Sequence, residues 1–485
     1  MSAAAEHQLD SKVVPRLPEI RPILAIGIGV GLSQFAQVAM GMTDAAMMAR
    51  LGPGPLAAGM LVSSLWVQGA LFCLGMQVAM LPVLGAAVGS GSSERVTSVL
   101  RAGQIMTAGL CVLQGLYLAA LPFVLRLFTA DATVIAEGTR YALGLIAGVI
   151  PWMFFVSTRF FLIAKGEVGI FVPVSLLGIV INALLNFVLM YGAVTGRPLG
   201  VVGSAISTSL TSWIMLGLLL AHMRLRANQR SVAEFFKGHG ATVRNIVRDL
   251  ANLGWPIGLI FFSENLIFSV GSLLIGRIDT TSLAAFVAVQ QWLVVSYMLP
   301  VGISNAATAR IGFHIGRGDN TGVRAVLAAA LIITIVYSVA LSVLFLALAP
   351  LCVRIFGVDP LAHPDFVAKA TSDMAWLAVI QFFNNFIVVI AGVMRGFRDT
   401  KTPLIAMFRN YWIMGTGSTI LLTFLLQERG VWLGIALGLA LTLASITFSL
   451  RAKLSKLDSL IREIGGRDSA MGRFEAAETA TQKGG

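Results

Sequence analysis

Long runs of apolar residues recur along this chain from near its start to about residue 450, and they constrain its fold more than any other feature. A hydrocarbon core about 30 Å thick needs roughly 20 apolar residues per helix. The stretches between Arg21 and Asp44 and between Arg429 and Arg451 reach that length. The composition agrees, with 57% hydrophobic residues, 12% charged residues and a mean hydropathy of +0.84. The sequence therefore predicts an all-α protein that crosses a membrane many times.

The apolar runs and the charged clusters between them predict twelve spans, six in each half. Residues 51–93 carry no charge and could hold either one long span or two short helices. The predicted spans lie near residues 23–47, 55–88, 96–125, 132–163, 168–192, 200–223, 252–276, 283–314, 321–353, 366–394, 401–427 and 430–450.

The two sets of spans predict two six-helix lobes. We expect a cytoplasmic tail at 1–21, an amino-terminal lobe at 22–224, a basic cytoplasmic linker at 225–250, a carboxy-terminal lobe at 251–451 and a cytoplasmic tail at 452–485. In the last segment, apolar residues recur at helical spacing opposite cations. They fit either an amphipathic helix on the inner leaflet or a solvated tail helix, and they are Leu454, Leu457, Ile461 and Ile464.

An internal repeat relates the two halves. Residues 49–103 align without a gap onto residues 276–330, at an offset of 227 residues, with 15 identities in 55 positions. Both copies end their second span on the pattern GxxxGxG, at Gly85, Gly89 and Gly91 and at Gly312, Gly316 and Gly318. Each half has six predicted spans, which is an even number, so both halves have the same orientation in the membrane. Parallel repeats of this kind suit alternating access to a site between two lobes.

The formal net charge of +12 has two readings, nucleic-acid binding or membrane topology. If the amino terminus is cytoplasmic and the spans alternate, most Lys and Arg residues fall at cytoplasmic ends or in the tails, as the positive-inside rule requires. We therefore expect both termini in the cytoplasm and no nucleic-acid partner.

Two carboxylates fall inside predicted spans, where a charge is costly. Glu264 lies near the middle of the seventh span, and Asp44 ends a polar face of the first span. Each could be a structural carboxylate, and Asp44 could instead sit at the membrane interface. A proton or cation carrier is the functional alternative. The polar face of the first span also contains Gln34 and Gln37, which we assign to a substrate cavity.

Amides pair at helical spacing in two further spans. Asn182 and Asn186 share a face of the fifth span, and Gln381, Asn384 and Asn385 share a face of the tenth. Such amides often join one helix to another. Their recurrence in both halves favours a cavity here, and we include all five residues among the candidates.

Three arginines lie in or near spans. Arg159 and Arg310 fall close enough to the cytoplasmic ends for their side chains to reach the interface. Arg409 lies deeper in the eleventh span and could pair with Glu264.

Several catalytic motifs are absent. There is no GxxxxGK[ST] for ATP, no HExxH and no Cys/His metal spacing. We expect no enzyme activity and no cofactor, so an ion gradient must supply the energy.

The chain resembles the multidrug and toxic compound extrusion (MATE) family of cation-coupled antiporters. The residues that carry the resemblance are TDAAMMARLGPGPLAAGM, GAAVGSGSSERVTSVLRAG, AKGEVGIFVPVSLLGIVINALLNFVLMYG, LGWPIGLIFFSENLIF and VMRGFRDTKTPLI. The resemblance implies two six-helix lobes that open outward as a V.

The resemblance also implies functional roles. Asp44 is similar to the first-span carboxylate of family members, and Asn182 and Asn186 are similar to its fifth-span partners. Glu264 is similar to the seventh-span glutamate of family members. Many sodium-coupled members have an aspartate where Asn384 stands, so we favour H⁺ over Na⁺ as the coupling ion.

We therefore expect a monomeric antiporter of the bacterial inner membrane that exports amphipathic, often cationic drugs in exchange for H⁺ or Na⁺. The alternative is a lipid-linked saccharide exporter of the same superfamily, although few Lys or Arg residues lie mid-span.

Overall fold

Helices account for nearly all of the residues that the structure describes. The computed structural model describes residues 19–128, 131–194, 196–226, 240–264, 266–355, 362–461 and 463–464. The amino-terminal half contains α2 (Ile20–Ala49), α3 (Pro53–Val78), α4 (Met80–Gly89), α5 (Ser93–Phe128), α6 (Ala132–Lys165), α7 (Phe171–Met190) and α8 (Val201–Arg226). The carboxy-terminal half contains α10 (Gly240–Ser263), α11 (Leu266–Gly276), α12 (Thr280–Arg317), α13 (Asn320–Ala347), α14 (Ala349–Arg354), α15 (Pro364–Gly396), α16 (Lys401–Ala406), η2 (Met407–Gly415), α17 (Thr416–Leu426) and α18 (Glu428–Leu454).

The predicted all-α, polytopic fold is confirmed. Within the described ranges, eleven helical segments are long and apolar enough to cross a membrane. The segment predicted as the eleventh span, 401–427, is divided among α16, the π-helix η2 and α17, so no single long helix represents it. The uncharged stretch forms one continuous span over Pro53–Gly89, in which α3 and α4 meet at Ala79.

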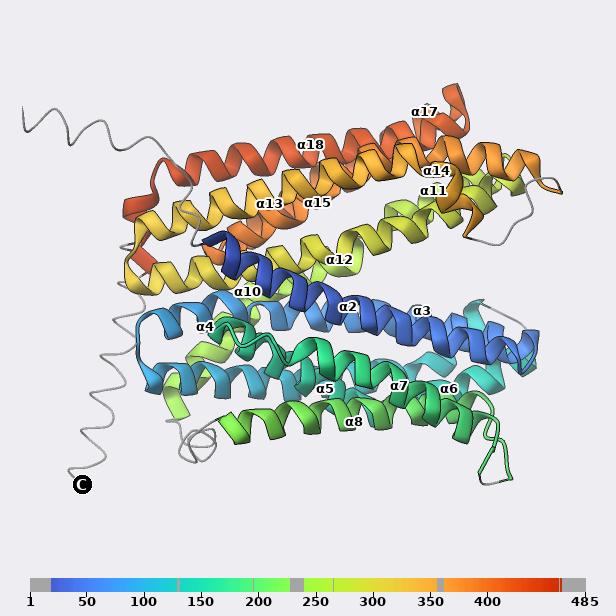
Figure 1. The fold of residues 1–485 in the computed structure, drawn as a ribbon, viewed down its shortest axis with the longest axis horizontal. Helices are drawn as coiled ribbons and strands as arrows, with labels where there is room; N and C mark the ends of the chain where they lie inside the picture. The colour runs from blue at the N-terminus through green and yellow to red at the C-terminus, as the bar shows by residue number, and fades with distance from the viewer. Residues whose placement is uncertain are drawn as a thin grey trace, which may run out of the picture.

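The two halves form two lobes that lie side by side (Figure 1). Helices α2–α8, blue to green, make one lobe, and α10–α18, yellow-green to red, make the other. We call the end of the bundle where α2 begins the proximal end and the opposite end the distal end. The lobes meet toward the proximal end and draw apart toward the distal end, which is the V shape that the resemblance implies.

Glycines bring the backbones of the two lobes into direct contact. A Cβ atom added to Gly85 or Gly89 would lie 2.4 Å from Ala309 O or 2.0 Å from Phe313 O. Conversely, a Cβ at Gly312 or Gly316 would lie 2.6 Å from Pro82 O or 2.2 Å from Ala86 O. Only glycine permits so close an approach. The two copies of the GxxxGxG pattern therefore pack against each other at the junction of the lobes.

Two predicted boundaries differ in the structure. Helix α10 begins at Gly240, inside the segment predicted as a linker, and its Val243 and Ile246 are buried. Leu457, Ile461 and Ile464 of the carboxy-terminal segment are also buried and belong to the same hydrophobic cluster. These side chains pack against protein, a contact that neither interpretation of this segment included. Residues 1–18 of the predicted amino-terminal tail and residues after 464 lie outside the described residues.

Candidate functional site

Asp44 lies at the centre of a polar cluster in the amino-terminal lobe. Its carboxylate is 8% exposed. Asn186 on α7 donates to Oδ1 from Nδ2 at 2.5 Å, and Thr208 on α8 donates to Oδ2 at 3.1 Å. Asn182, one turn before Asn186 on α7, accepts from the same amide at 3.3 Å. The structure thus brings together the three residues that the sequence assigns to this lobe and adds Thr208.

Glu264 lies where the seventh span is interrupted. Helix α10 ends at Ser263, α11 begins at Leu266, and Glu264 is in the turn between them. Tyr297 on α12 places its hydroxyl 2.8 Å from each carboxylate oxygen. Interrupted helices leave backbone groups free to contact ions or substrates at membrane depth, which is why such breaks often occur at transporter sites.

A second irregular helix faces this break. The nine-residue π-helix η2 carries Met407 and Tyr411, and the Tyr411 hydroxyl donates to the backbone oxygen of Glu264 at 3.2 Å. That bond satisfies a carbonyl group freed by the end of α10. Short π-helical segments are frequent at functional sites.

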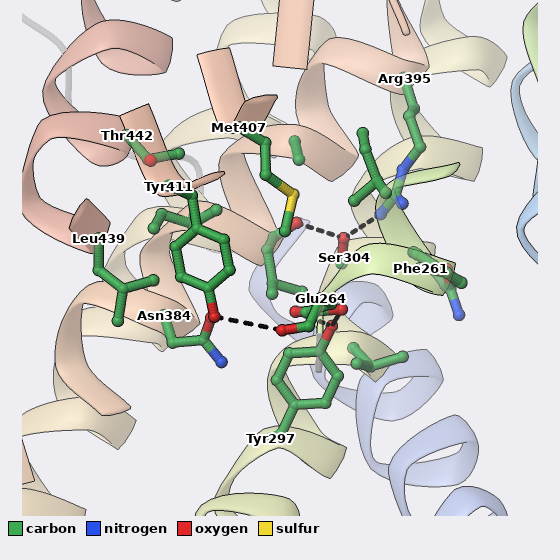
Figure 2. A pocket seen from close by; sticks show the side chains of 16 residues that line it. Phe261, Glu264, Tyr297, Ser304, Asn384, Arg395, Met407, Tyr411, Leu439 and Thr442 are labelled. Carbon is green, nitrogen blue, oxygen red and sulfur yellow. Dashed lines mark hydrogen bonds between the residues drawn. The ribbon is translucent and has the colours of Figure 1, made fainter. Parts of the chain in front are cut away.

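Glu264 lines a pocket inside the carboxy-terminal lobe (Figure 2). Tyr297, Asn384 and Tyr411 lie around its carboxylate, while Arg395 approaches from the side of Phe261. The Arg395 guanidinium donates to Ser304 Oγ at 2.6 Å. The pocket therefore contains one carboxylate, one guanidinium and neutral hydroxyl and amide groups.

The amides of α15 separate into two roles. Asn384 lines the pocket, whereas Gln381 and Asn385 are fully buried against α13. Gln381 donates to Ser342 Oγ at 2.7 Å, and Asn385 donates to Ser338 Oγ at 3.1 Å. These two amides join α15 to α13, and neither lines the pocket around Glu264.

The glutamines of α2 lie apart from both carboxylates. Gln34 accepts from Arg159 Nη1 at 2.7 Å, and Gln37 has a buried amide nitrogen without a hydrogen-bond partner. Arg159 is 1% exposed, so it does not reach the interface as predicted. Its guanidinium instead contacts Gln34 of α2 and lies near the rings of Phe155 and Phe160.

Arg409 does not pair with Glu264. It points away to Asn410 Oδ1 and Ser445 Oγ, at 3.1 Å and 3.2 Å. Arg395 is the cation that lines the Glu264 pocket. The sequence places Arg395 in the RGFRDTKTP segment at a span end, and it is not among the predicted site residues.

Four site residues escaped the sequence analysis: Thr208, Tyr297, Arg395 and Tyr411. None of them belongs to the carboxylates or paired amides that the sequence patterns single out. Only the rotation of neighbouring helices brings each one to a carboxylate or, for Arg395, into the pocket. One lobe therefore holds the buried carboxylate Asp44 and the other the partly buried carboxylate Glu264, each near neutral donors. This property is typical of a membrane transporter that binds ions or substrates between helices.

Comparison with known proteins agrees with this class. The MatE family model matches residues 30–188 and 256–419. A protein named Probable multidrug resistance protein NorM from Synechococcus sp. is 30% identical over 432 residues, which cover 87% of this chain and 92% of that protein. A protein of the same name from Mesorhizobium japonicum is 31% identical over 446 residues, covering 88% and 92%. The crystal structure of the eukaryotic MATE transporter AtDTX14 superposes with a TM-score of 0.81 at 20% identity, covering 93% of this chain and 99% of the other.

The chain belongs to the MATE family. It is therefore a membrane transporter and not an enzyme, as the sequence predicted.

Proposed function

We propose that this protein exports amphipathic, often cationic compounds across a bacterial inner membrane in exchange for protons. The observation that carries the proposal is one carboxylate inside each lobe: Asp44 is buried, and Glu264 lines a pocket. The names of the two NorM relatives support the substrate class. The basic residues that the sequence assigns to cytoplasmic span ends lie at the proximal end. By the positive-inside rule, they support a cytoplasmic position for that end.

The donors around Asp44 favour a proton over sodium. Asn186 and Thr208 direct N–H and O–H groups at the two carboxylate oxygens. Sodium would need oxygen lone pairs at those positions. At Glu264 the nearest side-chain donor is the Tyr297 hydroxyl, and the neighbouring amide, Asn384, is neutral. Within the described ranges, no group of three His, Cys, Asp or Glu residues is arranged so that it could hold a metal ion.

Alternating access would couple these sites to export. When a carboxyl binds a proton, it loses its charge and its strongest hydrogen bonds, so the helices that surround it gain a different preferred packing. In the outward-open V, protonation from outside would then release drug. In the inward-open state, proton loss would restore the charged site.

The test is drug efflux in reconstituted vesicles with an imposed proton or sodium gradient. We compare the wild type with Asp44→Asn and Glu264→Gln, and use Glu94→Gln, an exposed carboxylate at the start of α5, as the matched control. Efflux should follow the proton gradient and fall at least about tenfold in one or both site variants. Unchanged efflux in both would defeat the coupling proposal, and transport of lipid-linked saccharide without efflux of any organic cation would support the alternative exporter.

A further inference from the structure

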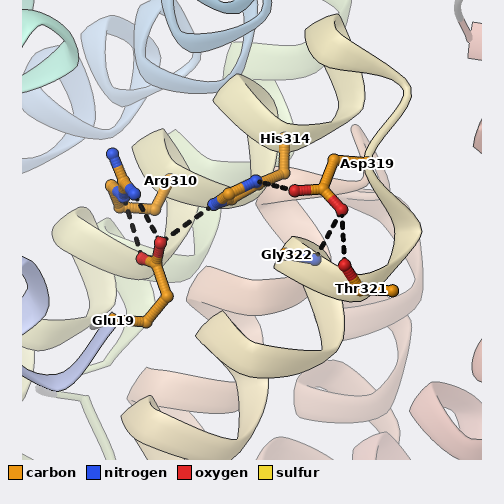
Figure 3. A network of polar contacts seen from close by, with 6 residues as sticks. All are labelled: Glu19, Arg310, His314, Asp319, Thr321 and Gly322. Carbon is orange, nitrogen blue, oxygen red and sulfur yellow. Dashed lines mark hydrogen bonds and ion pairs between the residues drawn. The ribbon is translucent and has the colours of Figure 1, made fainter. Parts of the chain in front are cut away.

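A cluster of charged groups joins the two lobes at the proximal end (Figure 3). Glu19 precedes α2 of the amino-terminal lobe, Arg310 and His314 lie one turn apart on α12 of the other lobe, and Asp319 caps α13. Glu19 accepts from Arg310 Nε at 3.0 Å and from Nη2 at 2.6 Å. We call these four residues the His314 cluster.

The two ring nitrogens of His314 both face carboxylate oxygens. Nδ1 lies 3.1 Å from Asp319 Oδ2, and Nε2 lies 3.1 Å from Glu19 Oε1. A neutral imidazole carries one N–H and one lone pair, so it could donate to only one of the two ionised carboxylates. Only the imidazolium form donates to both. The side chain is 8% exposed, so water cannot readily relieve the unfavourable contact in the neutral form.

The two carboxylates remain ionised at physiological pH. Burial alone would raise the pKa of Glu19, but hydrogen bonds from His314 and Arg310, together with the Arg310 charge, lower it to about 2. Burial likewise opposes ionisation of Asp319, but hydrogen bonds from the Gly322 backbone and Thr321 lower its pKa. Both ring nitrogens of His314 therefore face groups that can only accept a hydrogen bond.

The surroundings isolate this contact. Arg317 on α12 lies over the Phe313 ring, and Asp458 binds Asn320 beside the cluster. The ten residues of α4, which packs against α12 here, contain no titratable side chain. A Cβ at Gly322 would lie 2.0 Å from His314 Nδ1, so this glycine is required for the ring to reach Asp319.

We propose that His314 is a proton-binding site, distinct from the intramembrane carboxylates, that joins the lobes when it is protonated. Because Glu19 belongs to one lobe and His314 to the other, proton binding favours the conformation with a closed proximal end. Proton loss leaves a lone pair against a carboxylate and weakens that closure. The cytoplasmic placement of this end rests on the proposed function, while the contact itself does not.

The site exists in one copy only. At the repeat offset of 227, the positions that correspond to Arg310, His314 and Asp319 are occupied by Val83, Ala87 and Ser92. The duplicated glycines hold both lobes together symmetrically, but pH acts on one edge of that junction.

The test measures the distance between the lobes as a function of pH. Spin labels are attached at Ser93→Cys and Arg324→Cys, exposed positions at the proximal end of each lobe, after replacement of the three native cysteines. The background carries Asp44→Asn and Glu264→Gln, so that neither of the two proposed coupling carboxyls can titrate. In this background the ratio of short to long distances should rise at least about threefold from pH 8 to pH 6. A ratio that does not change with pH would overturn the proposal, whatever the efflux assay gives.

Two variants of the cluster should act in opposite directions. His314→Gln carries no charge and has a single donor nitrogen in place of the two ring nitrogens, so the ratio should stay low at both pH values. Asp319→Asn still caps α13 and turns an amide donor toward Nδ1, so a neutral imidazole can satisfy both neighbours and the ratio should stay high at both pH values. The control is His363→Gln, an exposed histidine at the distal end, which should preserve the wild-type response. A wild-type pH response in either cluster variant would overturn the proposal.

Discussion

At the scale of single residues, the carboxylates Asp44 and Glu264 differ in what surrounds them. Asp44 receives an amide and a hydroxyl from neighbouring helices α7 and α8. Glu264 lies in an interrupted helix with tyrosines and an arginine in its pocket. The two carboxylates therefore lie in unlike environments, and mutations around one should affect transport differently from mutations around the other.

Thr208 tests the Asp44 cluster without removing the carboxylate. Thr208→Val keeps the side-chain shape but removes the donor to Asp44 Oδ2. A hydrogen bond to a charged group contributes about 1.5–3 kcal/mol, so we expect proton-driven efflux to fall by about tenfold or more. Thr208→Ser retains the hydroxyl and should keep most of the activity. Equal efflux in the valine and serine variants would contradict this role for Thr208.

Glu19 gives a prediction for stability as a function of pH. Because its pKa in the folded protein is about 2, below the ordinary 4.5, its contribution is present above pH 4.5 and is lost as the pH falls toward 2. Glu19→Gln should lower the Tm at pH 7 by about 2–4 °C, the response of a lobe-sized domain to roughly 1 kcal/mol after allowance for solvent screening. Thermal unfolding in detergent at pH 7 and pH 3 measures this. The difference between variant and wild type should shrink at pH 3, and a constant difference would refute the assignment.

Sequence reasoning reached some of these residues and missed others for a physical reason. Asn182 and Asn186 are four residues apart, so helical periodicity alone puts them on one face. Thr208 is a single hydroxyl on another helix, and its contact with Asp44 depends on how α8 rotates against α7. Periodicity specifies the face of one helix and does not specify the partner helix.

At the scale of elements, the interruptions in α10–α11 and at η2 form the Glu264 site together. Neither FFSENLIF nor MFRNYWIMG contains a proline, and their only glycine, Gly415, ends η2. Local sequence therefore predicts continuous helices. The contact from Tyr411 to the Glu264 backbone stabilises both irregularities at once, so tertiary packing overrides local propensity.

Close packing of η2 against α18 should be required for this geometry. A Cβ at Gly438 would lie 2.7 Å from Gly415 Cα. Gly438→Ala should push η2 away and displace Tyr411, lowering both thermal stability and efflux several-fold. Gly417→Ala, where nothing lies within 4 Å of the added Cβ, is the control. Efflux assays and thermal unfolding check both variants, and equal behaviour would exclude this packing role.

At the scale of the whole molecule, the glycine contacts between the lobes obey the repeat beyond the aligned segment. The pairs Gly27–Ile303 and Gly254–Met76 correspond at the same offset of 227 residues, as do Gly85–Ala309 and Gly312–Pro82. The sequence identified these scaffold glycines but not that the two copies touch each other. That fact depends on the placement of one lobe against the other.

A methyl group at this junction should disturb the closed proximal end. Gly85→Ala places a Cβ 2.4 Å from Ala309 O, whereas Gly109 on α5 has open space around it. We expect Gly85→Ala to lengthen the distance between spin labels at the proximal end and to reduce efflux, with Gly109→Ala unchanged. Identical distance distributions for the two variants would show that the junction tolerates the methyl group.

The same offset relates the functional positions differently. Glu264 corresponds to Gln37, and Asp44 corresponds to Gly271, so the two carboxylates do not occupy equivalent places in the repeat. The glycine contacts that join the lobes occupy equivalent positions in the two halves of the repeat. The carboxylates inside the lobes do not.

Reciprocal contacts of this kind have a consequence for the origin of the fold. When Gly85 of one half meets Ala309 of the other, and Gly312 meets Pro82, each half presents the same patch to its partner. That is the isologous interface of a two-fold homodimer. A pair of identical six-helix subunits could therefore have assembled through this surface before their genes were fused. Fusion would then have freed each subunit to acquire its own carboxylate.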